Sequence, residues 1–190
     1  MNKPHKPYLT LVQIIGVKMR RKDREVTDFD EIINILDKCG VLHLSMISNG
    51  MPYSVPVNFG YIIKEENGTK RLSVYIHGAG EGKKVSALRV NPAVSFSGVA
   101  YSQTDSLSED KSIPCNWTCY YESVIGFGNV TFLEHSAEKS VGLDAIMLHN
   151  GYRIPKGIKT IAYAAMELAR TSVIRIDVSE ITGKRHKPAK

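Results

Sequence analysis

The segment Tyr75–Lys84, YIHGAGEGKK, places an expected strand end, a glycine-rich turn and two adjacent lysines at the start of an expected helix. Backbone N–H groups at a helix N-terminus lack partners and carry a partial positive charge, so they attract anions. Lys83 and Lys84 add two full charges there. The spacing indicates a phosphate site, although such a turn can also serve conformation alone. It is not the P-loop pattern, which needs a longer glycine loop and a Ser or Thr after the lysine.

His77 lies at the end of the same expected strand, beside the glycine-rich turn. An isolated histidine is more often a hydrogen-bonded structural residue than a reactive one. Next to a phosphate-binding turn it becomes a candidate proton donor, substrate anchor or haem ligand.

The remaining reactive side chains suggest no second chemistry. Cys39, Cys115 and Cys119 form an odd set, interpreted as reduced thiols of a cytoplasmic protein. The spacing of Cys115 and Cys119 fits a helix face better than a zinc knuckle, and no second ligand pair is visible, so we expect no metal site. The chain has no G-x-S-x-G motif, and Ser123 falls in an expected strand, which argues against a serine hydrolase.

The charge of +6 comes from 25 Lys and Arg against 19 Asp and Glu, with most of the excess at the two ends of the 190-residue chain. These ends are interpreted as solvated tails, and no nucleic-acid partner is expected. The apolar run Tyr8–Val17 is too short for a membrane span, and basic residues follow it instead of a cleavage site. We therefore expect a cytoplasmic protein with no membrane partner.

Strand-like runs alternate with tight turns and a few helical segments. Three helices are predicted: one after the caps Thr27 and Asp28 up to Gly40, one over Gly80–Asn91, and one capped by Ser136 and running to about Asn150. Six strands are expected at Val41–Ser48, Met51–Tyr61, Arg71–His77, Ala93–Ala100, Tyr120–Glu134 and Thr171–Val178. The polar stretch Tyr101–Asn116 is predicted to be a long loop, and residues 151–169 are expected to be irregular or short helix.

Details of these runs predict their places in the sheet. Asn49-Gly50 is a hairpin signal, and Pro52 and Pro56 put the following strand at an edge or a bulge. Alternation in Arg71–His77 places Leu72, Val74 and Ile76 in the core and Tyr75 on the other face. Gly126 and Gly128 mark a bend or a close backbone approach, while Trp117, Tyr120 and Tyr121 are expected to pack in a core or dimer interface rather than stack on a ligand. The fold class is mainly β: a six-stranded antiparallel barrel with peripheral helices.

Several segments taken in order resemble the nitroimidazole-resistance (Nim) proteins, a branch of the pyridoxamine 5'-phosphate oxidase-like FMN-binding split barrels. They are MRRKDREV from Met19, YSVPVNFGY, YIHGAGEGKK, YESVIGFGNV and ARTSVIRIDVSEITGKR. The resemblance spans about Met19 to Arg185, is weaker in Ser102–Ser112 and Gly151–Glu167, and is specific only for the whole set. It implies a split-barrel domain over residues 19–185, between an N-terminal extension, 1–18, and a basic tail, 186–190.

The resemblance also implies a site in a homodimer with FMN between the subunits. Lys83 and Lys84 would hold the phosphate, and His77 and Gly78 would lie near the ribityl chain or the site mouth. The flavin ring would lie along Val55, Pro56, Val57 and Asn58, with Ser123 and Val124 contributed near the same groove, across the dimer. Backbone donors near the ring would stabilise negative charge on the reduced cofactor.

The implied activity is flavin-dependent reduction of a small molecule, either a nitro compound of the 5-nitroimidazole type or an unknown physiological acceptor, with His77 supplying protons. The C-terminal TGKRHKP lacks the substrate-binding arrangement of true pyridoxamine phosphate oxidases, which argues against vitamin B6 oxidation. Three alternatives stay open: a haem-binding split barrel with His77 as ligand, a non-enzymatic flavin-binding dimer, and, ranked last, a nucleic-acid-binding barrel.

Overall fold

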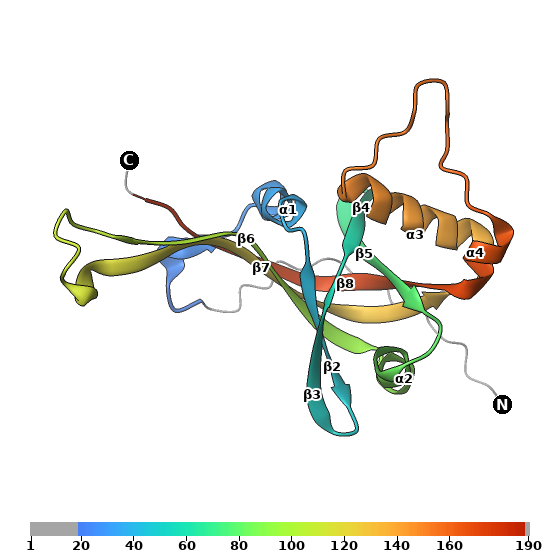
Figure 1. Ribbon diagram of the computed structural model, residues 1–190, viewed down its shortest axis with the longest axis horizontal. Helices are drawn as coiled ribbons and strands as arrows, with labels where there is room; N and C mark the ends of the chain where they lie inside the picture. Colours follow the sequence, from blue (N-terminus) through green and yellow to red (C-terminus); the bar gives the residue numbers. More distant parts are fainter. Residues whose placement is uncertain (1–18, 189–190) are drawn as a thin grey trace.

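The computed structural model describes residues 19–188, and one antiparallel sheet dominates it (Figure 1). Its strands are β1 (Glu25–Val26), β2 (Leu42–Ser48), β3 (Met51–Val57), β4 (Phe59–Glu66), β5 (Thr69–Ala79), β6 (Ala93–Ser106), β7 (Trp117–Leu133) and β8 (Thr171–His186). The helices are α1 (Phe29–Asp37), α2 (Lys83–Val90), α3 (Ser136–His149) and α4 (Ala165–Arg170), with 3-10 turns at Lys22–Arg24 and Pro114–Asn116. This arrangement confirms a mainly β split barrel with peripheral helices.

The strand order within the described residues is β3-β2-β6-β7-β8-β5-β4, and β1 pairs separately with β8. The two ends of this order, β3 and β4, are consecutive in the chain. β8 lies between β7 and β5, so it alone joins the four-stranded part β3-β2-β6-β7 to the hairpin β5-β4. This position makes β8 the central element of the sheet.

The predicted count of six strands is wrong, because the described residues form eight. The predicted strand Met51–Tyr61 is two strands that separate at Asn58. Val57 pairs with Leu42, whereas Phe59 pairs with Ile76, so the chain passes at Asn58 from one end of the strand order to the other. The second additional strand is the two-residue β1, which is too short to show a pattern in the sequence.

Two tight hairpins fix the register of the outer strands. Asn49 and Gly50 have φ values of 52° and 75°, and Asn67 and Gly68 have 52° and 73°, the left-handed conformation that a two-residue type I′ turn requires. The two residues that flank such a turn form a hydrogen-bonded pair, and hydrogen-bonded pairs then alternate with non-hydrogen-bonded pairs along the two strands. Pro52 and Pro56 occupy the intervening pairs of β3, where an amide would point away from β2. Neither proline therefore removes a ladder bond, and the predicted edge position is confirmed.

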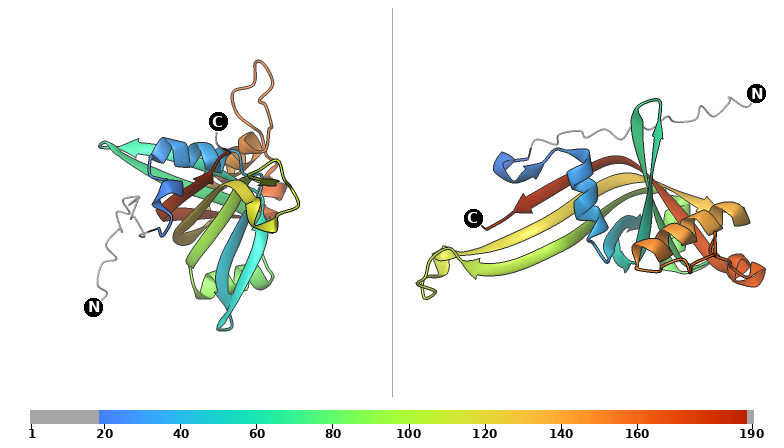
Figure 2. Two further views of the ribbon diagram at one scale, coloured as in Figure 1. Left: turned by 90° about the vertical axis from the view of Figure 1, so that its left-hand side faces the viewer. Right: turned by 90° about the horizontal axis from the view of Figure 1, so that it is seen from above.

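Four strands, β5, β6, β7 and β8, are longer than predicted. β6 continues to Ser106 and β7 begins at Trp117, so the predicted loop Tyr101–Asn116 is reduced to residues 107–116. The polar residues of this stretch pair across a two-stranded ribbon that projects from the barrel (Figure 2). The sequence did not predict these strands, because both faces of the ribbon are in solvent and the residues show no alternation of apolar and polar types. Cys119 consequently lies in a strand, not on a helix face. β8 likewise continues past Val178 to His186.

Helices cover both faces of the sheet. α1 is capped by Asp28, whose side chain accepts from the Glu31 amide at 2.9 Å, and its buried isoleucines and Leu36 join the barrel core. α3 packs across β4 and β5, and therefore buries Tyr75, which the alternation had placed outside the core. His135, not Ser136, is the N-cap residue of α3.

Glycines allow the closest contacts of this packing. A side chain at Gly60 would overlap the α3 backbone, one at Gly126 would overlap the buried Phe96 ring, and one at Gly128 would overlap the β8 backbone. The predicted close approach at Gly126 and Gly128 is confirmed.

The predicted N-terminal extension lies outside the described residues. Within residues 19–188, no helix combines the length and apolar character needed to cross a membrane.

Candidate functional site

The end of β5 and the start of α2 form a turn with an uncapped helix N-terminus. Gly82, at the N-cap position, has a φ of 112°, which favours glycine, and the first intrahelical bond runs from the Ser86 amide to its carbonyl at 3.0 Å. No side chain caps the helix, and its first turn contains no acidic residue. The amides ahead of Ser86 are therefore available to an anion, as the sequence predicted.

Lys84 folds back over the end of β5. Its Nζ lies 3.2 Å from the position that a Cβ on Gly78 would occupy, so the glycine makes room for the ammonium. Within residues 19–188, no carboxylate lies within ion-pair distance of Lys84. Burial lowers the pKa of this ammonium. A half-buried cation without a counter-ion is a suitable partner for a bound anion.

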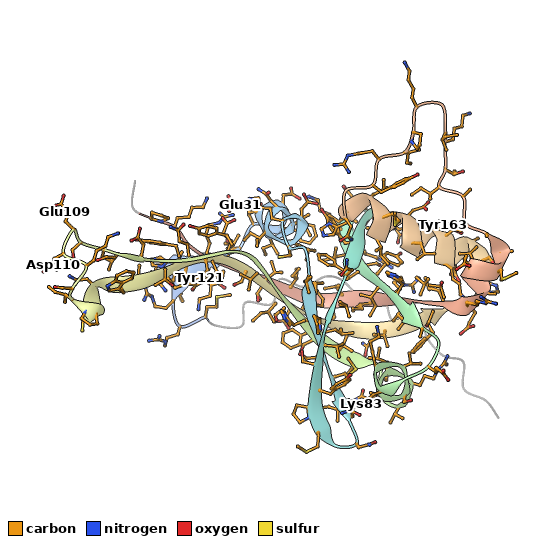
Figure 3. All side chains as sticks on the ribbon, viewed as in Figure 1. Glu31, Lys83, Glu109, Asp110, Tyr121 and Tyr163 are labelled. Carbon is orange, nitrogen blue, oxygen red and sulfur yellow. The ribbon has the colours of Figure 1, made fainter. Side chains whose placement is uncertain are left out.

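Lys83, the second predicted phosphate ligand, contacts an aromatic ring from another strand. Its Nζ lies 4.3 Å from the ring centroid of Tyr53 in β3 (Figure 3 shows Lys83 on α2 beside β3). This contact brings the β3 edge to the lysine turn. Sequence reasoning missed Tyr53, because its spacing from Lys83 carries no local signal.

His77 is exposed at the end of β5, level with Val173 of β8. Partial burial lowers the pKa of its imidazole, and the charge of Lys84 lowers it further. The ligand-free imidazole is therefore mainly neutral at pH 7.

The four residues predicted to follow the flavin ring lie at the end of β3 and just after it. Val57 is buried in the barrel core, Val55 is partly buried, and Pro56 and Asn58 are exposed. By the hairpin register, the amides of Val55 and Val57 are used in the ladder to β2, and Pro56 has no N–H. Of these four residues, Asn58 is the one whose backbone N–H is not used in the ladder to β2.

Ser123 and Val124 lie in β7, away from the lysine turn. His77 and Leu133 both pair with Val173 of β8, so they lie at the same level of the sheet. The ten positions of β7 from Leu133 to Ser123 span roughly 30 Å at about 3.3 Å per residue. Val124 is 1% exposed, so its side chain belongs to the core. The two residues are therefore far from the lysine turn along β7, whereas the register through β6 and β2 places Val124 level with Val57.

Ser123 lines a small apolar cavity on the outer face of β7 and β8. The cavity has a volume of about 280 Å³, and Met19, Ile125, Phe127 and Thr182 are also in its wall. Ile125 and Phe127 are 48% and 43% exposed. These side chains add exposed apolar surface to the rim of the cavity.

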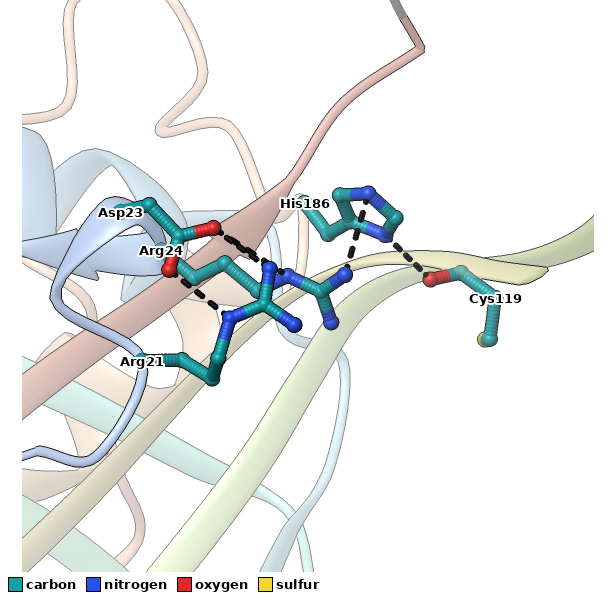
Figure 4. Close-up of polar contacts among 5 residues, drawn as sticks. All are labelled: Arg21, Asp23, Arg24, Cys119 and His186. Carbon is teal, nitrogen blue, oxygen red and sulfur yellow. Dashed lines mark hydrogen bonds and ion pairs between the residues drawn. The ribbon is translucent and has the colours of Figure 1, made fainter. Parts of the chain in front are cut away.

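A polar cluster holds the segment before β1 against this side of the sheet (Figure 4). The Nδ1–H of His186 donates to the Cys119 carbonyl at 2.8 Å, so the opposite nitrogen, Nε2, is free to accept from the Arg24 guanidinium at 3.3 Å. Arg21 forms a 2.6 Å ion pair with Asp23. The cluster ties β7, β8 and the first described residues together.

The three predicted packing aromatics differ in burial. Tyr120 is 8% exposed and packs against the His186 ring, with centroids 5.0 Å apart, whereas Trp117 is 43% exposed on the projecting ribbon. Tyr121 is partly buried. It lies far from Lys83 (Figure 3). Only Tyr120 is part of a packed interior in a single chain.

The family model described as pyridoxamine 5'-phosphate oxidase matches residues 28–185, which include the lysine turn, the β3 edge and all long strands. The chain belongs to the pyridoxamine 5'-phosphate oxidase family. The resemblance predicted from the sequence is thereby confirmed. No protein of curated function matches the chain.

Several solved structures share the fold of this chain. A candidate 5-nitroimidazole antibiotic resistance protein from Bacteroides thetaiotaomicron is 25% identical, with a TM-score of 0.66 over 84% of this chain and 85% of that one. A flavocytochrome from Azotobacter vinelandii is 19% identical, with a TM-score of 0.66 over 90% of this chain and 72% of that one. An FAD- and haem-binding protein from Mycobacterium smegmatis is 18% identical, with a TM-score of 0.67 over 87% and 74%.

Proposed function

We propose that this family member is a homodimeric, FMN-binding reductase of nitro compounds or of another small electron acceptor. The observation that carries the proposal is the half-buried Lys84, which has no carboxylate partner in the described chain and lies beside an uncapped helix N-terminus. A phosphate dianion would compensate both features at once. Support also comes from the similarity to the Bacteroides protein and from the two solved relatives, one named a flavocytochrome and the other an FAD- and haem-binding protein.

The residues of the turn fit the phosphate of FMN. Lys84 and the free amides of α2 would bind its oxygens, and Lys83 would add a second charge from its position over Tyr53. The isoalloxazine ring would lie along the edge of β3, next to Asn58, whose backbone N–H is not used in the ladder to β2. When bound, the flavin supplies the two-electron chemistry that side chains lack.

His77 is the proton donor of the proposed reaction. Lys84 now lowers its pKa, and a phosphate beside Lys84 would offset that charge and favour the protonated imidazole. Binding of the cofactor would thus prepare the acid that protonates the reduced nitro oxygen.

A second copy of the chain would complete the site. Measured along β7, Ser123 lies roughly 30 Å from the level of His77 in its own chain, so we expect Ser123 to reach the flavin from a partner subunit. The exposed apolar face of β6 and β7 is the surface that a partner would cover; it carries Val99, Tyr101, Ile125 and Phe127. In such a dimer, Ser123 of one protomer would approach the lysine turn of the other.

The test is a titration with FMN followed by flavin absorption and fluorescence. We expect the Lys83→Ala, Lys84→Ala double variant to lose binding, and a Lys156→Ala, Lys159→Ala control in an exposed loop to retain it. Unchanged FMN binding in the first variant would refute the phosphate assignment. Absence of flavin binding together with a Soret band after haem addition would favour haem, with His77 as the candidate ligand.

A further inference from the structure

A cavity of about 440 Å³ lies on the other side of the molecule, between the end of α1, the free edge of β4 and α3. We call it the β4-edge cavity. None of the predicted site residues contributes to it. It is lined by Asp37, Tyr61, Ile62, Val141, Asp144, Ala145, Leu148 and His149.

His149 forms the floor of the β4-edge cavity. Its side chain is 5% exposed, and its ring stacks on the buried Phe59, with centroids 4.3 Å apart. Its Nε2 lies 2.9 Å from the Cys39 carbonyl. A carbonyl can only accept, so Nε2 carries the proton and, in the neutral ring, Nδ1 presents a lone pair.

This lone pair faces a carboxylate across a gap. Nδ1 lies 3.8 Å from Oδ1 of Asp37, beyond hydrogen-bond range, and two acceptors cannot bond each other. The Tyr61 hydroxyl donates to the same carboxylate at 2.9 Å. Burial, followed by the bond to Asp37, raises the pKa of Tyr61 to about 12, so the phenol remains a donor. Nδ1 of His149 and the Asp37 carboxylate are therefore two neighbouring acceptors, and an ammonium group lying beside both has enough N–H groups to donate to each.

The other residues that line the cavity indicate the charge and the polarity of a ligand that would fit it. Asp144 contributes a second carboxylate; burial, followed by a hydrogen bond to this carboxylate, raises the pKa of the Tyr163 hydroxyl. No lysine or arginine lines the cavity, whereas Ile62, Val141 and Leu148 give it an apolar wall. Val141 and Leu148 are 48% and 43% exposed, which leaves apolar surface at the rim. The lining therefore combines negative charge with apolar contacts.

The free edge of β4 adds backbone groups to the same side. Among the described residues, β4 pairs only with β5. The Phe59 carbonyl accepts from Nδ2 of Asn150 at 2.9 Å, so it points away from β5. Tyr61, two residues further, has the same orientation, so its N–H and C=O also point away from β5.

We propose that the β4-edge cavity binds a small organic cation with a primary ammonium group and an apolar body. The ammonium would donate to Nδ1 of His149 and to Asp37 together, and the body would lie against Ile62 and Leu148. The proposal is independent of the flavin site.

The probe is 2-phenylethylamine, titrated calorimetrically at pH 8, where imidazole is ordinarily neutral. Its neutral counterpart is 2-phenylethanol. We expect the amine to bind and the alcohol to bind at least about tenfold more weakly, because the alcohol loses a charge-assisted pair. Asp37→Asn keeps an acceptor for Tyr61 but removes the charge, and should weaken amine binding about tenfold or more. Asp110→Asn, the same change in the exposed 107–116 loop, should leave it unchanged.

Three results would overturn the proposal: equal binding of amine and alcohol, unchanged amine binding by Asp37→Asn, or no amine binding at about 10 mM ligand. Asp37 is 63% exposed in its side chain, so the substitution should not disturb folding, and a thermal melt checks this. FMN titration of the same variant separates the two sites, because loss of amine binding should leave FMN affinity unchanged.

Discussion

Replacement of Lys84 by methionine should change stability and ligand binding in opposite directions. Methionine keeps an unbranched apolar side chain of similar length, so the contacts of the lysine stem over Gly78 are largely retained. The variant loses only the ammonium, whose pKa burial lowers and which lacks a carboxylate partner in the described chain. We therefore expect the ligand-free Lys84→Met protein to melt at the same temperature as the unmodified protein or higher.

The same variant should bind FMN more weakly. A hydrogen bond between charged groups contributes about 1.5–3 kcal/mol, and its loss corresponds to roughly 10–150-fold in affinity. Riboflavin has the same ring system without the phosphate. Its affinity should therefore be almost unaffected by Lys84→Met, which separates loss of the phosphate contact from a general disturbance of the site.

The assay is quenching of flavin fluorescence with FMN and riboflavin in parallel, combined with thermal melts of the ligand-free protein. Lys159→Met, in an exposed loop, matches the change in net charge. An equal loss for FMN and riboflavin would mean that Lys84 supports the turn and not the phosphate. A lower melting temperature of ligand-free Lys84→Met would show that the ammonium is stabilised by contacts other than those described.

Other changes test the pKa, the packing and the dimer. The pKa of His77, followed by NMR, should rise when FMN binds and also in ligand-free Lys84→Met, because both remove the effect of a positive charge. Because the pKa of His77 in the folded protein lies below the ordinary value of about 6.5, the free energy of unfolding should fall as the pH drops from about 6.5 to the folded-state pKa. His77→Gln should lose this part of the pH dependence, and an unchanged pH dependence in the variant would contradict the assignment. Gly60→Ala should destabilise the protein by about 3 kcal/mol in denaturant melts, since its methyl group overlaps the α3 backbone, whereas Gly80→Ala, in open space, should have little effect. Ile125→Glu should give monomers in sedimentation experiments and also lose FMN; monomers with full FMN affinity would refute the shared site.

The sequence predicted well those features that local patterns determine. Asn49-Gly50, the Asp28 cap and the turn before Lys83 each depend on residues close in the chain, and the structure has all three. The alternation of Leu72, Val74 and Ile76 identified one face of β5 for the same reason.

Features set by distant contacts were not predictable in this way. Tyr75 is buried because α3 packs on the outer face of β5, and α3 begins about sixty residues later. The ribbon beyond Ala100 is polar on both faces, so its strands resembled a loop. Tyr53 contacts Lys83, and His149 contacts Asp37, through tertiary packing alone. Much of each candidate site was therefore invisible in the sequence.

The central position of β8 has a consequence for how the chain folds during synthesis. A ribosome releases β2 to β7 before β8, and these strands can form a four-stranded piece and the separate hairpin β5-β4. Until β8 emerges, the edges of β7 and β5 that it later joins are unpaired, and open strand edges favour association with other chains. We expect the nascent protein to depend on chaperones until Thr171–His186 has left the exit tunnel, and ribosome-bound chains stalled before β8 to be far more sensitive to protease than those stalled beyond it.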